Sequence, residues 1–418
     1  MLREQCPDVP LNNLHHHIDM DWLLEAFRRT RKDGATGVDG ETAETYAADL
    51  HANLQSLLDR MKSGRYVAPP VRRTHIPKDN GESRPIGIPT FEDKVAQRAI
   101  VMVLEPILER DFHACSFGFR PGRSAHQAHK AVRDGIMSMP DGCWLIDADI
   151  SKCFDTMDRT YMRAFLRQRV RDGVVDRMVG KWLKAGVMED GRWHRDEAGT
   201  PQGGVISPLL SNLYLHEVLD EWVYRDVLPR LRGAAFLVRF ADDFVMGFER
   251  EDDARRVFAV LSNRFERYGL RIHPEKTRLL DFRKPSPPAR KGKSTFDFLG
   301  FRHYWARSLR GYWVVKAKTA APRLSRSLKR INVGCRRMRH EPIPRQHGQL
   351  CRQMQGHYAY FGIPCNQRSL WAFRQEVMRI WRKWLCRRSR ASAMNWDTFN
   401  RLLTRFPLPS PRVIHTLT

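Results

Sequence analysis

Apolar residues follow two patterns along this chain. Short runs rich in β-branched and aromatic residues, such as CWLIDADI (143–150) and AAFLVRFADDFVMGF (234–248), are typical of strands. Longer stretches repeat an apolar residue every third or fourth position, as amphipathic helices do, and one of them follows the segment TPQGGVISP (200–208). Since both patterns mix through the first 300 residues, we expect an α+β fold.

The end of TPQGGVISP predicts where that helix begins. Ser207 is a suitable N-cap, and Pro208 suits the first helical position because it lacks an N–H to satisfy. The buried face of the helix is then expected to contain Leu210, Tyr214, Val218 and Trp222.

The end of the chain has the helical pattern. Apolar residues recur at helical spacing in one stretch, which predicts a buried stripe made of Leu370, Phe373, Val377, Trp381 and Trp384. A segment rich in Pro, Lys and Arg, KPSPPARKGK (284–293), precedes this region and is typical of an exposed loop.

Charge divides the chain more sharply than hydropathy does. The 418 residues have a formal net charge of +25, yet residues 301–418 hold 25 basic and only 3 acidic side chains. The first 300 residues hold 47 basic and 44 acidic side chains and are therefore nearly balanced. Most of the cations near the end are arginines, whose planar fork matches phosphate, so this region predicts a nucleic-acid partner.

Other classes of protein fit poorly. The hydrophobic share of 42% predicts a folded chain, but no apolar run is long enough to span a bilayer, so we expect no membrane partner. The first residues, MLREQCPDVPLNNL, lack the apolar core of a secretory signal. The eight cysteines form no CxxC pair, which argues against a zinc ribbon and predicts reduced thiols in the cytoplasm.

Three aspartates stand at the ends of predicted strands. Asp149 closes the first run, while Asp242 and Asp243 separate two runs that are expected to pair as a hairpin. Alone, two adjacent aspartates are most simply turn residues. If the strands are neighbours, however, the three carboxylates converge and can hold two Mg²⁺ ions for in-line displacement at phosphorus. Asp147 faces the same way as Asp149, and we expect it to pair with a nearby arginine.

Several residues near these runs suit a nucleotide pocket. Lys78 and Arg84 lie on a turn-like stretch, HIPKDNGESRPIGIP (75–89), and can clamp phosphates. Lys276 follows another short apolar run and can reach a triphosphate or protonate pyrophosphate. The Gly pair of TPQGGVISP permits close backbone approach to a ligand. Each signal alone is common on protein surfaces.

The order of these segments carries a resemblance to a known family. The matching blocks are GATGVDG (34–40), IPKDNGESRPIGIPTFEDKVAQ (76–97), SFGFRPGRSAHQA (116–128), DADISKCFD (147–155), GTPQGGVISPLLSNLYL (199–215), VRFADDFV (238–245), GLRIHPEKT (269–277), FDFLGF (296–301), GHYAYFG (356–362) and WDTFNRLLTRFPLPSPRVIH (396–415). In this order and spacing, the chain resembles the reverse transcriptase/maturase proteins encoded by bacterial group II introns.

The resemblance implies a right-hand polymerase, with fingers and a palm built on an antiparallel sheet, followed by an α-helical thumb. It places an N-terminal extension at residues 1–60, the fingers and palm at 61–310, and the basic thumb or maturase domain X at 311–418. Asp149, Asp242 and Asp243 match the catalytic palm acids that bind two Mg²⁺ ions, and the Ile150 carbonyl is a further expected ligand.

The resemblance also assigns dNTP-binding residues. Lys78 and Arg84 match fingers residues on the triphosphate, and Lys276 matches a palm lysine near the phosphates. Gln202 matches a residue that lines the dNTP site. Phe154 matches the bulky residue under the sugar, whose ring would collide with a ribose 2′-OH and thereby favour dNTPs.

The implied partners are group II intron RNA, an RNA template with a DNA primer, dNTPs and target DNA, in the bacterial cytoplasm. The implied function is RNA-directed DNA synthesis together with intron RNA binding that assists splicing and retrohoming. Two departures stand out. Phe240 replaces the commoner tyrosine before the palm acids, so the ring is kept and the hydroxyl is lost. No His/Cys endonuclease module follows domain X, which predicts a member of the endonuclease-lacking type. The sequence does not indicate an oligomeric state.

Two alternatives stay open. One is a domesticated reverse transcriptase that serves phage defence or CRISPR-associated spacer acquisition, which the genomic neighbourhood would reveal. The other is a non-catalytic RNA-binding splicing factor with a relic palm, against which the intact acid set argues. A viral RNA-dependent RNA polymerase shares the palm chemistry but fits the blocks at 34–40 and 116–128 poorly.

Overall fold

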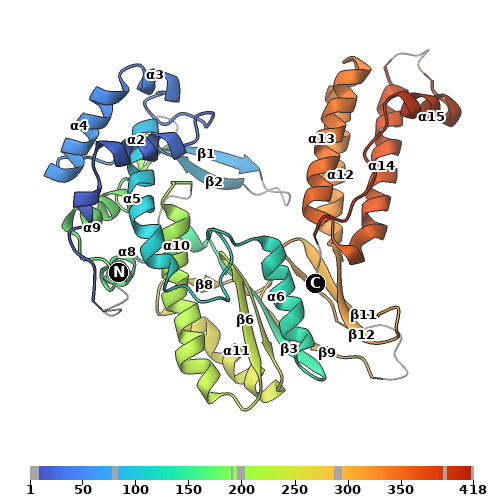
Figure 1. The fold of residues 1–418 in the computed structure, drawn as a ribbon. Coiled ribbons are helices and arrows are strands. Elements are labelled where there is room, and N and C mark those ends of the chain that lie inside the picture. The colour runs from blue at the N-terminus through green and yellow to red at the C-terminus, as the bar shows by residue number, and fades with distance from the viewer. Residues whose placement is uncertain are drawn as a thin grey trace. The chain divides into compact units, whose positions relative to one another are not determined.

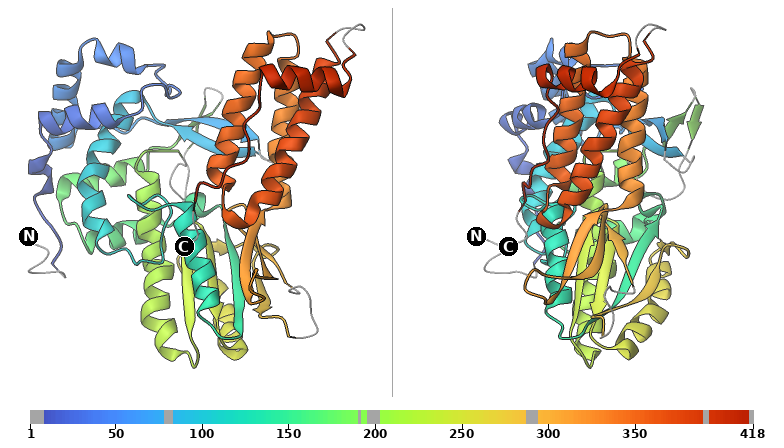
Figure 2. Two further views of the ribbon diagram at one scale, coloured as in Figure 1. Left: turned by 45° about the vertical axis from the view of Figure 1, so that its right-hand side comes forward. Right: turned by 90° about the vertical axis from the view of Figure 1, so that its right-hand side faces the viewer.

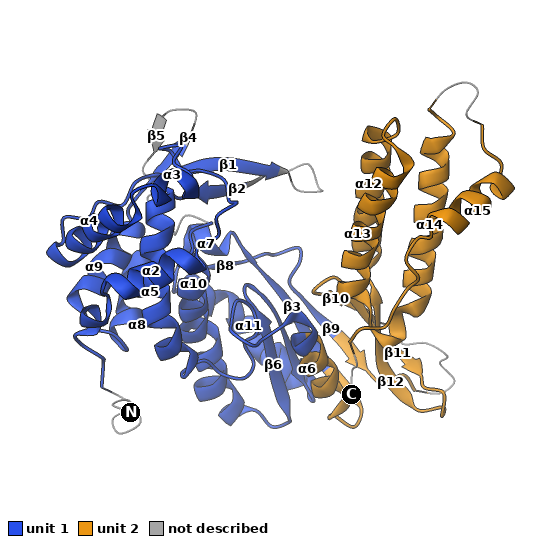
Figure 3. Cartoon of the chain, turned by 45° about the horizontal axis from the view of Figure 1, so that its top comes forward, with its two compact units in different colours: residues 1–128, 144–280 blue, residues 129–143, 281–418 orange. Residues whose placement is uncertain are grey.

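The fold was analysed in a computed structural model, which describes residues 9–77, 83–189, 192–194, 203–286, 294–388 and 393–415. The chain forms two compact units, one from residues 1–128 and 144–280 and the other from residues 129–143 and 281–418 (Figure 3). Helices and strands mix in the first unit, which confirms the α+β class. The boundaries at residues 60 and 310 stay predictions.

The first unit is built around a long buried helix, α5 (Phe91–Glu109). Thr90 caps this helix by accepting a hydrogen bond from the Asp93 N–H, and most of the helix is buried because its apolar residues occupy every face. The other helices are α2 (Met20–Arg29), α3 (Ala43–Ala47), α4 (Leu50–Ser63), α7 (Cys153–Thr156), α8 (Arg159–Arg167), α9 (Gly173–Trp182), α10 (Ser207–Leu215) and α11 (Glu251–Glu266), with the helical turns η1 (Leu14–His17), η2 (His216–Asp220), η3 (Val223–Val227) and η4 (Leu228–Arg230).

A four-stranded sheet in this unit has the order β2-β1-β4-β5. Its strands are β1 (Val71–Pro77), β2 (Ser83–Ile88), β4 (Val187–Glu189) and β5 (Arg192–His194). β1 pairs with β2 in antiparallel and with β4 in parallel orientation.

A second sheet has the order β6-β7-β3-β8. Figure 1 labels its strands β3 and β6. Its strands are β3 (Gly142–Ser151), β6 (Ala235–Phe240), β7 (Asp243–Phe248) and β8 (Arg271–Ile272), and β9 (Arg278–Arg283) also pairs with β3. The pairs β6–β7, β7–β3 and β3–β8 are antiparallel, which confirms the antiparallel sheet expected from the resemblance. α11 packs on this sheet, where Phe265 stacks on Phe244 with 5.8 Å between ring centroids.

The helix after the Gly-rich segment begins one residue earlier than the sequence predicted. Ile206 is its N-cap, Ser207 is its first residue and Pro208 its second, so the assignment of Ser207 as N-cap is wrong. The Gln97 Oε1 atom accepts a hydrogen bond from the Ile206 N–H at 3.2 Å, and Ile206 already has right-handed helical backbone angles.

The second unit combines a small antiparallel sheet with long helices. The sheet contains β10 (Phe296–Phe298), β11 (Phe301–Arg307) and β12 (Trp313–Thr319). The helices are α12 (Ala321–Arg337), α13 (Ile343–Phe361), α14 (Gln367–Leu385) and α15 (Trp396–Arg405), with the short turn η5 (Pro364–Asn366). The helix α6 (Ala125–Met137) begins in the first unit and continues into the second. α12, α13 and α14 run side by side, which confirms the helical character predicted for the end of the chain (Figure 2).

The buried stripe of α14 matches the prediction except at its end. Leu370, Phe373, Val377 and Trp381 are buried, but the next buried position is Leu385, four residues after Trp381. Trp384 is only partly buried, and its indole N–H donates to Asn332 Oδ1 at 2.8 Å. Among the described residues, no helix combines the length and apolar character needed to cross a membrane.

Candidate active site

Three aspartates lie at one end of the second sheet. In the β3–β7 pair, Asp149 lies directly opposite Asp243, and opposite residues of an antiparallel pair project from the same face. In the β6–β7 pair, Phe240 lies opposite Asp243, so Ala241 and Asp242 form a two-residue turn between the strands. The hairpin and the neighbouring strand predicted from the sequence are confirmed, and the strand pairing places the backbones of the three acids at the same end of the sheet. Their shared role as metal ligands stays a prediction.

Lys276 forms an ion pair with Asp149. Its Nζ atom lies 2.7 Å from Asp149 Oδ2, and the side chains of Lys276 and Asp149 are 61% and 35% exposed, respectively. The backbone of Asp149 is held more firmly, because its carbonyl accepts a hydrogen bond from the His273 N–H at 2.8 Å. The strand therefore fixes the position of Asp149, while its carboxylate lies within reach of solvent and of a soluble cation.

Asp147 is paired with an arginine, as the sequence predicted. Arg278 donates from Nε and Nη2 to Asp147 Oδ2 at 3.1 and 3.0 Å. Asp147 is thus paired with an arginine through two hydrogen bonds, whereas Asp149, on the same strand, pairs with an exposed lysine.

Phe154 lies in α7, directly after β3, and is 8% exposed. Ile150 is buried, and its backbone pairs with Ile272 of β8. Lys152, between them, has a left-handed backbone conformation with φ 47°, which turns the chain sharply from the strand into the helix. The strand, this turn and the helix thus place Phe154 and the Ile150 backbone close in sequence to Asp149.

Three predicted nucleotide-binding residues have side chains that the structure does not describe. Lys78 and Gln202 lie outside the described residues. The backbone of Arg84 lies in β2 opposite Ile76 in the β1–β2 hairpin, while its side chain also falls outside the description. The roles of all three stay predictions.

The glycine pair that follows Gln202 packs against the β2 backbone at Gly203 and against side chains at Gly204. Gly203 has φ +120°, and a Cβ atom there would lie 2.4 Å from the Gly87 carbonyl oxygen of β2. At Gly204, a Cβ atom would lie 3.0 Å from Gln97 Oε1. These glycines therefore allow the segment before α10 to approach β2 and α5 closely.

The sequence-based reasoning missed Arg239, which supports the acidic turn from inside. Arg239 is fully buried and forms a two-point ion pair with Asp220, with Nε–Oδ1 and Nη2–Oδ2 distances of 2.9 and 2.6 Å. Its Nη1 group donates to the Ala241 carbonyl at 3.1 Å and to Asn212 Oδ1 at 3.0 Å. A charged residue inside the apolar run AFLVRF was the signal that could have indicated this role.

The backbone of the acidic turn is constrained as well. Ala241 has a left-handed backbone conformation with φ 57°, and the Ala241 carbonyl accepts from Arg239. Gly118 lies against this turn so closely that a Cβ atom there would come within 2.3 Å of the Ala241 nitrogen. The side-chain amide of Asn212 donates to the Gly118 carbonyl at 2.7 Å and thus joins Gly118 to the network around Arg239.

The electrostatics of this buried pair favour its charged form. Burial by itself raises the pKa of Asp220, but the charge of Arg239 and the polar contacts of His216 and Arg239 outweigh burial and hold that pKa below its ordinary value. Asp220 therefore stays ionised and holds Arg239 in place beneath the turn.

The chain is similar in sequence to a known protein family and to several individual proteins. The family described as "Reverse transcriptase (RNA-dependent DNA polymerase)" matches residues 76–303. Protein YkfC of Escherichia coli K12 is 38% identical over 256 residues, which cover 54% of this chain and 67% of YkfC. The group II intron-encoded protein LtrA of Lactococcus lactis is 38% identical over 188 residues, which cover 45% of this chain but only 30% of LtrA. Nuclear intron maturase 2 of Arabidopsis thaliana is 30% identical over 173 residues, which cover 32% of this chain and 23% of that protein.

The first prediction concerns Arg239. Replacing it by methionine leaves Asp220 buried without its partner, so the Arg239→Met variant should lose about 3–5 kcal/mol of unfolding free energy. Urea unfolding followed by circular dichroism measures this loss. Arg255→Met, at an exposed position of α11, is the control and should change stability by about 0.5 kcal/mol or less. Equal stability of the two variants would contradict the central role of the pair.

Proposed function

Because the chain belongs to the reverse transcriptase (RNA-dependent DNA polymerase) family, we propose that it is an active RNA-directed DNA polymerase encoded by a group II intron. The observation that carries the proposal is the strand register that places Asp149 opposite Asp243, with Asp242 in the adjoining turn. A relic palm would have no need to keep three carboxylates together, because like charges at short range repel each other.

The acids fit a pair of hard divalent cations. Carboxylate and backbone carbonyl oxygens are the ligands that Mg²⁺ prefers, and we assign Asp149, Asp242, Asp243 and the Ile150 carbonyl to this role. Bound Mg²⁺ would lower the pKa of the primer 3′-hydroxyl and neutralise charge on the triphosphate. The Arg239 network holds the turn that carries Asp242 and leads into Asp243 at the start of β7.

Lys276 completes the charge balance of the site. Paired with Asp149, it offsets part of the repulsion among the acids. Its exposed ammonium can exchange this carboxylate for a triphosphate oxygen, which also places it to protonate the leaving pyrophosphate.

The remaining nucleotide contacts are part of the same proposal. Phe154 stands under the sugar and excludes a 2′-OH, Gln202 lines the dNTP site, and Lys78 and Arg84 hold the triphosphate. The family resemblance supports these four assignments.

The basic helices of the second unit are proposed to bind the template–primer duplex and intron RNA. α12 contains no acidic residue. It carries exposed cations along its length, namely Arg323, Lys329, Arg330, Arg336 and Arg337. Such a cationic face attracts a phosphate backbone and releases counter-ions when it binds.

A maturase role is the second proposed function. LtrA is a group II intron-encoded protein, and another relative is an intron maturase. Binding of intron RNA to the cationic helices would favour the folded RNA over its open forms, since a ligand stabilises the state that it binds. The proposal also includes retrohoming, in which the intron inserts into a target DNA that the protein binds.

The second prediction tests polymerase chemistry. Purified protein with Mg²⁺, a DNA-primed RNA and dNTPs should extend the primer into cDNA. Asp149→Ala and Asp242→Ala should each lower the extension rate at least about a hundredfold, since metal-ligand loss removes several kcal/mol of transition-state stabilisation. Asp252→Ala, at the start of α11, is the control and should retain full activity. Absence of cDNA, or an active Asp242→Ala variant, would refute the polymerase proposal.

The third prediction tests the cationic helix. A quadruple variant should weaken RNA binding and lower the slope of log affinity against log salt by about 3, because each phosphate contact contributes about 0.7–0.9. The four residues changed to glutamine are Lys329, Arg330, Arg336 and Arg337. Filter binding at several salt concentrations gives the slope.

The matched control removes four exposed arginines from the first unit. These arginines are already paired with acids, so their replacement should leave the slope nearly unchanged. The control residues changed to glutamine are Arg230, Arg232, Arg255 and Arg256. Equal slopes for both quadruple variants would show that the cationic helix does not dominate RNA binding.

The fourth prediction concerns splicing. If the gene's flanks fold into a group II intron, that RNA should splice faster at low Mg²⁺ when the protein is added. Asp242→Ala should preserve this effect, because it alters the palm and leaves the cationic helices intact. A splicing rate that is the same with and without protein would exclude the maturase role while leaving the polymerase proposal standing.

A further inference from the structure

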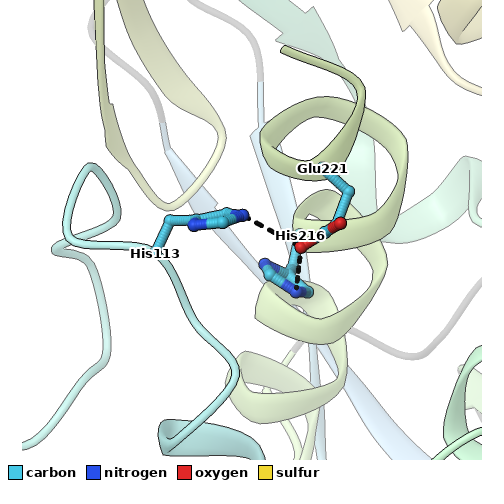
Figure 4. Close-up of side chains that lie close together, drawn as sticks. All are labelled: His113, His216 and Glu221. Carbon is cyan, nitrogen blue, oxygen red and sulfur yellow. Dashed lines mark hydrogen bonds and ion pairs between the residues drawn. The ribbon is translucent and has the colours of Figure 1, made fainter. Parts of the chain in front are cut away.

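Two histidines and a glutamate form a cluster in the first unit, outside the group of acids. His113 lies in the segment after α5, while His216 and Glu221 lie on the helical stretch that continues α10. Figure 4 shows both imidazoles pointing toward the carboxylate of Glu221. The Nε2 atoms of His113 and His216 lie 2.9 and 3.4 Å from Glu221 Oε1.

We propose that His113, His216 and Glu221 bind a divalent transition-metal ion, with Zn²⁺ as the best match. Two imidazole nitrogens and one carboxylate oxygen are a ligand set that Zn²⁺ favours, with water at the fourth position. Ligand distances of about 2.0–2.2 Å place neighbouring donor atoms of a tetrahedral site about 3.4 Å apart. The three candidate donor atoms already lie within 4.8 Å of one another, so small side-chain rotations suffice.

The far side of the His216 ring gives a second, independent observation. His216 is 1% exposed, and its buried Nδ1 atom has no hydrogen-bond partner among the residues that the structure describes. This atom lies 3.8 Å from Asp220 Oδ2. If the neutral ring donates its Nε2 proton to Glu221, the Nδ1 lone pair faces the Asp220 carboxylate, which is unfavourable in a buried setting.

A metal ion on Nε2 removes this mismatch. The ring proton then belongs on Nδ1, where it faces Asp220, and a carboxylate behind a metal-bound histidine is the usual arrangement around zinc. A neutral histidine ring keeps its single proton when the metal binds, because the proton moves from Nε2 to Nδ1. With Nε2 on the metal and the Nδ1 proton directed at Asp220, both ring nitrogens of His216 have partners of complementary charge.

The surroundings hold the ligands in orientation. The His113 ring stacks on Tyr224 with 4.1 Å between ring centroids. The rings of Phe112 and His216 pack in a T-shaped arrangement with 5.4 Å between centroids. Arg225 pairs with Glu221 through Oε2, so Oε1 is the oxygen that faces the two histidines. Arg225 is largely exposed and can leave without disturbing packing.

The proposed ion would have a structural role. It would fasten the segment after α5 to the helix that carries Asp220, and Asp220 holds Arg239 beneath the acidic turn. The site uses none of the palm acids, so it does not depend on the proposed polymerase function.

The fifth prediction is that the chelator-treated full chain binds one equivalent of Zn²⁺ or Co²⁺ in excess Mg²⁺, which saturates oxygen-rich sites. Bound Co²⁺ should show the visible absorption bands of a four-coordinate ion, and Zn²⁺ should raise the thermal midpoint in a concentration-dependent way. His113→Ala should weaken Zn²⁺ affinity at least about tenfold and abolish the Co²⁺ bands. His113 is chosen because it is partly exposed, so this variant should still fold.

Two further variants make the test decisive. Glu221→Gln preserves the side-chain shape and should lose the ion as well. The double variant His16→Ala/His17→Ala removes two exposed histidines of the His15–His17 run and should bind Zn²⁺ like the wild type. Failure of the wild type to bind one equivalent, or loss of binding in the double variant but not in His113→Ala, would overturn the proposal.

Discussion

The buried ion pair between Arg239 and Asp220 is the interaction on which the candidate active site depends. Both side chains are completely removed from solvent, and such a pair is stable only when each group is fully hydrogen-bonded. Arg239 meets this condition by donating to Asp220, to Asn212 and to the Ala241 carbonyl. The same hydrogen bonds that satisfy the buried charge therefore fix the strained turn before Asp242.

The three aspartates differ from this buried pair, because their charges all have the same sign. Three carboxylates at one end of a sheet repel one another, so the site gains stability from any cation that enters it. Lys276 supplies one such cation to Asp149, and the exposure of both side chains leaves the pair open to exchange. The negative charge of Asp147 is instead compensated by Arg278, which donates two hydrogen bonds to it. A rigid interior and an exchangeable surface cation suit a site that binds and releases a charged substrate at each step.

Close backbone packing explains why glycine occupies two positions near the site. Gly118 lies against Ala241, and Gly203 lies against Gly87, at distances that leave no space for a side chain. The recognisable blocks of the sequence around these glycines are thus places where separate segments touch. The cluster of His113, His216 and Glu221 lies at another such meeting point, where the segment after α5 reaches the helix that carries Asp220.

The sequence by itself determined the α+β class, the helical and cationic end of the chain, and the hairpin that carries Asp242 and Asp243. These features follow from local periodicity and charge, which specify the faces of each element that are buried. Tertiary structure decided which segments meet. Arg239 pairs with Asp220, which is 19 positions away in the chain, and His113 contacts Glu221, which is 108 positions away. Local patterns could not predict those pairs, because a buried polar group is satisfied by whichever partner the folded chain brings within hydrogen-bonding distance.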